Sequence, residues 1–124
     1  MSSQTAPELC DRFHKASELI GARWTGAVIF VMLKQQPCRF VTLRDAIPDI
    51  TDRMLSDRLR ELEREGIVVR TVVPETPVRI DYALTPKGRG LAKAIAAITD
   101  WAHRWMPLET ARREPRGRSR RRAR

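Results

Sequence analysis

Residues 51–70 read TDRMLSDRLRELEREGIVVR, and this stretch decides the fold. Thr51 has the side chain of a helix N-cap, and Gly66 is the residue type that most often follows a helix end, so we predict a helix over residues 51–65. Its apolar residues lie on one side, within about 40° of the first on a helical wheel. They are Leu55, Leu59 and Leu62. We expect this face to pack on a core.

The opposite side of the same helix is charged. Four residues lie between about 140° and 200° from Leu55: Arg53, Asp57, Arg60 and Arg64. Arginine reads guanine through two hydrogen bonds in the major groove of DNA, so this face suits phosphates and base edges. A surface helix of any kind also looks charged, and pairs such as Arg53 with Asp57 or Glu61 with Arg64 would then be solvated ion pairs. The helix alone leaves both interpretations open.

The sequence before residue 51 predicts three further helices. Apolar residues recur at helical spacing over residues 9–21. Residues 24–33 are almost wholly apolar, which is typical of a buried helix, and we expect Trp24 in the core. Residues 41–47 form a shorter helix closed by Pro48, with inward residues Leu43, Ala46 and Ile47.

After Gly66 the pattern changes from helix to strand. Residues 67–73 are rich in β-branched types, residues 74–77 form a turn, and residues 78–84 alternate apolar with polar. Two antiparallel strands are therefore predicted. Thr85-Pro86 then opens a last helix that runs to about Trp105.

The helices at 24–33, 41–47 and 51–65, a strand pair and a closing helix are in the order of a winged helix-turn-helix. The predicted fold class is mainly α with a small antiparallel β-hairpin wing. Residues 41–47 and 51–65 would form the helix-turn-helix unit around a turn at 48–50. The helix at 51–65 would enter the major groove, and the loop at 74–79 would be the wing.

Positive charge is concentrated at the C-terminus. The 124 residues carry a net charge of +9, of which +7 falls on residues 112–124, with eight arginines and one acid. We divide the chain into a disordered start at 1–8, a DNA-binding and dimerisation domain at 9–106, and an arginine-rich disordered tail at 107–124. The tail could track DNA, bind membranes or be a solvated end. Its lack of large apolar residues and of a lipidation signal disfavours membranes.

Composition argues against catalysis, cofactors and metals. The chain has two cysteines and two histidines, without paired-Cys spacing, a glycine-rich phosphate loop or a serine flanked by elbow glycines. We predict a non-enzyme without cofactor or metal. The apolar run at 24–33 is shorter than the roughly 20 residues of a membrane span. With so few cysteines and no secretion signal, the sequence predicts a cytoplasmic protein without membrane contact.

The last predicted helix carries an apolar stripe too wide for a single packing partner. Alanines at positions 94 and 97 widen it beyond about 140°, against about 100° for a helix packed on one side. A second partner surface is implied, and a homodimer is the commonest reason for one. The stripe residues assigned to this interface are Leu91, Ile95, Ile98, Trp101 and Trp105.

Four strings in the chain resemble the HxlR-type helix-turn-helix regulators, bacterial winged-helix relatives of the MarR group. They are LIGARWTGAVIFVML, RFVTLRDAIPDITDRMLSDRLRELEREGIVVR, PETPVRIDYALTPKG and ITDWAHRW. The resemblance covers Cys10 to about His103. It implies a homodimer that binds operator DNA and uses its first and last helices for most of the dimer contact. Leu9 and Phe13 therefore join the predicted interface.

The resemblance also implies which residues contact double-stranded operator DNA. In the N-terminal half of the reading helix they are Thr51, Asp52, Arg53, Ser56, Asp57 and Arg60, with Arg79 on the wing and Arg39 and Arg44 as phosphate contacts. We expect a repressor, because a DNA-binding domain without an effector domain can act by occluding a promoter. The alternative is a small nucleoid-associated protein that binds any duplex through its basic tail.

Cys10 is a candidate redox sensor. It stands at the start of the first helix close to Arg12, His14 and Lys15, and both positive neighbours and a helix N-terminus lower a thiol pKa. A small electrophile or oxidant would be the signal, as the resemblance allows for some members. The alternative is an ordinary small residue in a helix or interface. Family members often have Cys-Pro-Val here, whereas this chain has Asp11 after Cys10.

Overall fold

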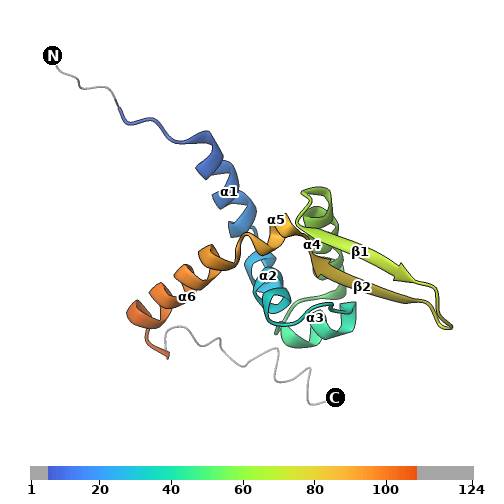
Figure 1. The fold of residues 1–124 in the computed structure, drawn as a ribbon. Coiled ribbons are helices and arrows are strands. Elements are labelled where there is room, and N and C mark those ends of the chain that lie inside the picture. Colours follow the sequence, from blue (N-terminus) through green and yellow to red (C-terminus); the bar gives the residue numbers. More distant parts are fainter. Residues whose placement is uncertain (1–5, 109–124) are drawn as a thin grey trace.

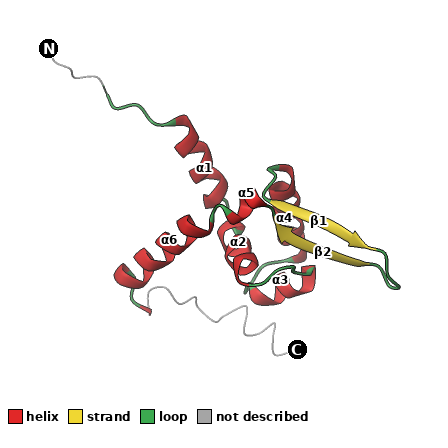
Figure 2. Cartoon of the chain, in the orientation of Figure 1, coloured by secondary structure: helices red, strands yellow, loops and turns green. Residues whose placement is uncertain are grey.

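A computed structural model describes residues 6–108 of the chain (Figure 1). Its elements follow the predicted order. Four helices come first: α1 (Asp11–Gly21), α2 (Thr25–Lys34), α3 (Phe40–Ala46) and α4 (Asp52–Arg64). Strands β1 (Val68–Val73) and β2 (Arg79–Leu84) follow, and then α5 (Pro86–Arg89) and α6 (Ala92–Trp105). Figure 2 shows a mainly helical chain with one projecting hairpin, which confirms the predicted fold class.

The core forms around α2. Val28, Ile29 and Met32 have no exposed surface, and neither do Leu55 and Leu62 of α4. Full burial of such side chains stabilises a fold by about 1.5–3 kcal/mol each. The leucine face predicted for the helix after residue 51 is therefore confirmed. Trp24, the N-cap residue of α2, is half-buried and packs against this core.

The connection between α3 and α4 is a tight turn. Asp49 takes a positive φ of 71°, a conformation that Asp tolerates better than most residues. The Thr51 hydroxyl accepts a hydrogen bond of 3.1 Å from the Met54 N–H and so caps α4. In α3, Leu43 is buried as predicted, and so is Ile47 directly after the helix, but Ala46, the last residue of α3, is exposed.

The hairpin is anchored at its base and free at its tip. Val68 pairs with Leu84, and both are buried. Tyr82 also exchanges two backbone hydrogen bonds, of 2.8 and 2.7 Å, with Cys38 in the loop between α2 and α3. Toward the tip, side chains such as Val78 are exposed, and Figure 1 shows both strands projecting beyond the helices.

The last helix differs from the prediction, because the chain breaks it into α5 and α6. The Thr85 hydroxyl donates to the Gly66 carbonyl at 2.6 Å, and the Arg89 guanidinium donates to the Leu84 carbonyl at 2.8 Å. These bonds hold α5 against the base of the hairpin. The chain then changes direction at Gly90, a residue type with low helix propensity, and α6 packs on α2.

Helices α1 and α6 both contact α2 and then diverge from it (Figure 1). No residue of α1 is buried, and Ile95 is the one buried residue of α6. Within residues 6–108, no single helix has the length and apolar composition to cross a membrane. The pair α1 and α2 meets these criteria together, but its helices are bent by 81°.

Replacing Gly88 with Ala is expected to lower the free energy of unfolding by about 1–3 kcal/mol, a typical cost of overpacking. A Cβ at Gly88 would overlap the backbone carbonyl oxygen of Ile67, which cannot rotate away, and would lie 3.0 Å from a Leu84 methyl group. Urea unfolding monitored by circular dichroism measures the change. Gly21→Ala is the control, because a Cβ there meets nothing within 4 Å. Equal stability of the two variants would contradict the prediction.

Candidate nucleic-acid interface

The outward face of α4 is polar and accessible. Arg53, Arg60 and Arg64 are exposed, and Ser56 and Asp57 are half-buried. The buried leucines on the opposite side fix this orientation, because a helix cannot turn without exposing them. The predicted charged face therefore exists as a surface.

The ion pairs on this face are not those considered from the sequence. Asp57 accepts from Arg60 at 2.7 Å rather than from Arg53, and Glu61 pairs with Arg58 at 3.2 Å rather than with Arg64. Among residues 6–108, Arg53 and Arg64 have no carboxylate partner. The solvated-pair interpretation therefore fails for these two arginines.

The predicted contacts around α3 are partly occupied in holding the helix-turn-helix together. Arg44 of α3 donates to both carboxylate oxygens of Asp52, at 3.2 and 3.4 Å, across the turn to the first residue of α4. Arg39 is the exposed N-cap residue of α3 and has no ion-pair partner in the described part of the chain. Thr51 caps α4, so Thr51, Arg44 and Asp52 all have structural roles.

Arg79 lies at the start of β2 between two carboxylates. Its Nη1 donates to Glu75 at 2.9 Å, and its Nε and Nη2 donate to the two Asp81 oxygens at 3.2 and 3.4 Å. Asp81 is on the same face of the strand two residues on, so it orients the guanidinium. Glu75 belongs to the loop at the hairpin tip. Arg79, the predicted wing arginine, is therefore held in one orientation and already paired with two carboxylates.

A polar groove separates α4 from the hairpin. It has a volume of about 400 Å³ and is lined by Ser56, Leu59, Arg60, Glu63, Arg70 and Tyr82. Sequence reasoning missed Arg70 and Tyr82. Strand alternation could have identified Arg70, because Val68, Arg70 and Val72 share one face of β1. Tyr82 lies opposite Arg70 in the register of the two strands.

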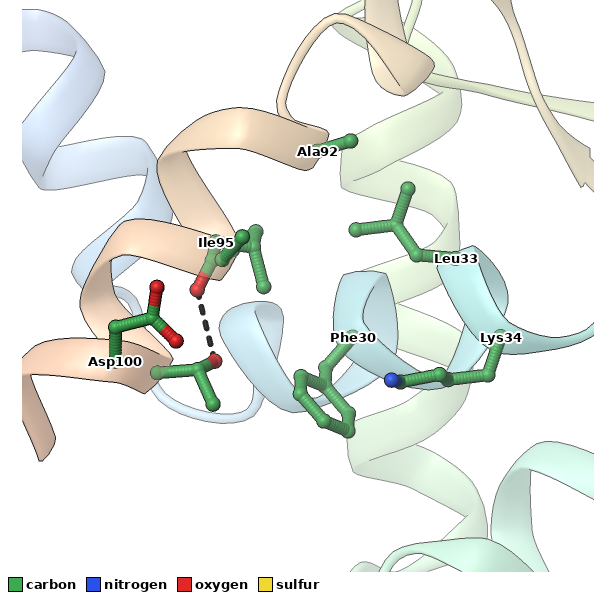
Figure 3. A pocket seen from close by; sticks show the side chains of 8 residues that line it. Phe30, Leu33, Lys34, Ala92, Ile95 and Asp100 are labelled. Carbon is green, nitrogen blue, oxygen red and sulfur yellow. Dashed lines mark hydrogen bonds between the residues drawn. The ribbon is translucent and has the colours of Figure 1, made fainter. Parts of the chain in front are cut away.

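A second hollow lies between α2 and α6 (Figure 3). The Lys34 ammonium is 5.1 Å from the centre of the Phe30 ring, and Asp100 faces the hollow from α6. The Thr99 hydroxyl donates to the Ile95 carbonyl at 2.8 Å and is thus satisfied within its own helix. In the described residues, no three His, Cys, Asp or Glu side chains come together as a metal site.

The predicted interface residues in and next to α1 and α6 differ in exposure. Five apolar side chains are 56–63% exposed: Leu9, Phe13, Ile98, Trp101 and Trp105. Ile95 is instead buried and Leu91 half-buried against the chain's own core. Between α1 and α6 lies an apolar groove of about 410 Å³ whose lining includes Phe13, Leu91 and Ile98.

The two cysteines have opposite environments. Cys10 is exposed at the N-cap of α1, where its sulfur accepts a hydrogen bond of 3.4 Å from the Phe13 N–H. Cys38 is buried, its thiol donates to the Gln35 carbonyl at 2.7 Å, and burial raises its pKa. A raised pKa lowers the thiolate fraction, so Cys38 is the less reactive of the two.

A helix-turn-helix with a basic outward face beside a projecting hairpin defines a winged helix-turn-helix protein. The model of the HxlR-like helix-turn-helix family matches residues 19–110. The chain belongs to this family, and it is a transcriptional regulator of the helix-turn-helix type.

Relatives and solved structures agree with this assignment. The HTH-type transcriptional regulator YvaP of Bacillus subtilis is 46% identical over 99 residues, which are 80% of this chain and 91% of YvaP. The reduced form of the regulator YodB from B. subtilis superimposes with a TM-score of 0.71 at 39% identity, covering 80% of this chain and 96% of YodB. The oxidised redox regulator HypR gives a TM-score of 0.72 at 33% identity, covering 77% and 98%. YodB structures also include diamide-treated and quinone-bound forms.

Proposed function

We propose that this regulator is a sequence-specific repressor that binds operator DNA as a homodimer, with the helix at 51–65 in the major groove and the loop at 74–79 as the wing. One observation carries the proposal: α4 presents Arg53 and Arg64 outward without a carboxylate partner among residues 6–108, and a hairpin projects beyond the helices next to α4. A repressor needs no more than this, because occupying a promoter blocks it. The nucleoid-associated alternative lacks support from the relatives, which are regulators.

Arg53 is the residue we assign to base reading. It lies in the first turn of α4, it is exposed, and it has no carboxylate partner among residues 6–108. The N-terminal residues of a recognition helix are those that reach base edges. Ser56, Asp57 and Arg60 extend the same face, while Arg39, Arg44 and Arg79 lie on flanking elements and are assigned to phosphates.

The homodimer is proposed from the exposed apolar surfaces of α1 and α6. A helix such as α1, with no buried residue and an exposed Phe13, needs a second surface to pack on. A second copy of the chain satisfies this need by twofold symmetry. It would also place two reading helices about one DNA turn apart.

We further propose that Cys10 makes the repressor responsive to oxidants or electrophiles. Three features support this: the thiol is exposed, it lies on a proposed dimer helix, and similar regulators have oxidised, diamide-treated and quinone-bound structures. An intersubunit disulfide would need the two Cys10 Cα atoms within about 7 Å. Otherwise the product is a sulfenic acid, a mixed disulfide or an adduct on one subunit.

Apart from residues 107 and 108, the basic tail at 107–124 lies outside the described residues, as do residues 1–5 of the predicted disordered start.

Arg53→Ala is expected to weaken binding to the operator by about 1–3 kcal/mol, the cost of one lost bidentate base contact. The operator is found by footprinting on the DNA upstream of the protein's own gene, and affinity is compared with that for a random duplex across salt concentrations. Arg12→Ala, which removes the same charge from exposed α1, is the control. Operator affinity unchanged by Arg53→Ala would refute the assignment. Equal wild-type affinities for both duplexes would support the nucleoid-associated alternative.

Ile98→Asp is expected to convert the dimer to a monomer, because a carboxylate would be buried without a partner at the interface. Sedimentation velocity at micromolar concentration measures the oligomeric state. His103→Asp places the same charge on another side of α6 and should leave the dimer intact. A wild-type monomer at this concentration would overturn the dimer proposal.

Diamide is expected to change the operator affinity of the wild type reversibly, and a reductant should restore it. Cys10→Ser should abolish the response, because it removes the accessible thiol, whereas Cys38→Ser should retain it. Gel-shift titrations before and after treatment measure the effect. If Cys10→Ser still responds as the wild type does, the signal acts elsewhere.

A further inference from the structure

The groove between α4 and the hairpin brings together polar side chains from three elements. Arg60 comes from α4, Arg70 from β1 and Tyr82 from β2, and Leu59 lines the same groove from its buried position on α4. A volume of about 400 Å³ is ample for a phosphate group. Two guanidinium groups and a phenol are the donors that bind such an anion, since arginine matches phosphate geometry with two parallel hydrogen bonds.

The donors of this groove are largely uncommitted. Among residues 6–108, Arg70 has no carboxylate partner and the Tyr82 hydroxyl makes no hydrogen bond. Arg60 donates Nη2 to Asp57 and is 65% exposed, so its remaining N–H groups are available. Glu63 is the one acidic residue in the lining, and the lining as a whole is therefore net positive.

The groove is also held in place before any ligand arrives. Arg70 and Tyr82 are directly opposite each other in the ladder, and the backbone of Tyr82 is bonded on its other side to Cys38. The opposing wall is α4, fixed by its buried leucines. The backbone positions of the donors are thus fixed before binding, so ordering on binding is confined to their side chains, which favours affinity.

We propose that this groove seats a backbone phosphate of duplex DNA, held by Arg70 and Arg60 with the Tyr82 hydroxyl. The inference rests on the proposed function. With α4 in the major groove and the hairpin tip at the neighbouring minor groove, the DNA strand that separates the two grooves passes between α4 and the hairpin. That is where this lining lies, and its Ser56 and Arg60 belong to the reading face. Such a contact fixes the register of the protein on DNA without reading sequence.

Arg70→Gln tests the proposal by its effect on binding at several salt concentrations. The variant should lose affinity for the operator and for a random duplex by the same factor, and its log–log salt slope should fall by about 0.9, the value for one phosphate contact. Tyr82→Phe should lower both affinities without changing the slope. Glu63→Gln should raise both. Arg12→Gln is the matched control, because it removes one charge from α1, far from the hairpin in Figure 1.

A duplex series with single neutral methylphosphonates locates the phosphate. At the seated position, the substitution should weaken the wild type but leave Arg70→Gln unaffected. Circular dichroism and urea unfolding confirm that each variant folds. Inorganic phosphate is titrated against wild type and Arg70→Gln without DNA. Phosphate binding that depends on Arg70, together with unaltered duplex binding, would assign the groove to a free anion and overturn the proposal.

The outcomes separate this inference from the proposed function. A wild type that binds both duplexes equally would refute sequence-specific repression, and the groove would still be tested on the random duplex. A wild type that binds operator strongly while Arg70→Gln matches the Arg12→Gln control in affinity and slope would refute the groove alone. Failure to bind any duplex would overturn both.

Discussion

Burial of the α4 leucines in the common core, to which α2 contributes Val28, Ile29 and Met32, is the interaction on which the rest of the structure depends. Because Leu55, Leu59 and Leu62 are buried, the arginines on the other side of α4 must face outward. Helix α4 ends at Arg64, and Gly66 two residues later takes a φ of 76°, which turns the chain into β1 at Val68. Burial of one helix face therefore positions the candidate reading surface, the strands and the groove between them.

Local patterns predicted most of this fold, and long-range contacts account for what they missed. The helices, the hairpin and the buried leucine face follow from apolar spacing and caps, which act over a few residues. The break between α5 and α6 does not, because it depends on bonds from Thr85 and Arg89 to the base of the hairpin. Ala46 was wrongly placed in the core, because the spacing groups it with Leu43 and Ile47, which are buried, and does not show which side of α3 other elements cover.

The candidate nucleic-acid interface was likewise predicted where it depends on local patterns and missed where it depends on long-range contacts. A helical wheel predicts the outward face of α4. It does not predict which carboxylate each arginine pairs with, because several carboxylates lie within reach of every arginine on the helix. Arg70 and Tyr82 come together through strand register and through the bridge to Cys38, and a charged residue in a strand carries no local sign of either. Exposed ion pairs such as Arg60 with Asp57 contribute about 0–1 kcal/mol, so a phosphate can displace the carboxylate with little loss.

The position of Cys10 at the cap of α1 links thiol chemistry to a local unfolding equilibrium. Elements without buried side chains open at low free energy, and α1 is such an element in the protomer. A cap satisfies one of the unpaired N–H groups at a helix start, and even the weak acceptor of a cysteine sulfur contributes to a helix with so little other stability. Modifying the Cys10 sulfur alters the acceptor of the Phe13 N–H, so we expect it to shift the fraying of α1 while the buried core stays folded.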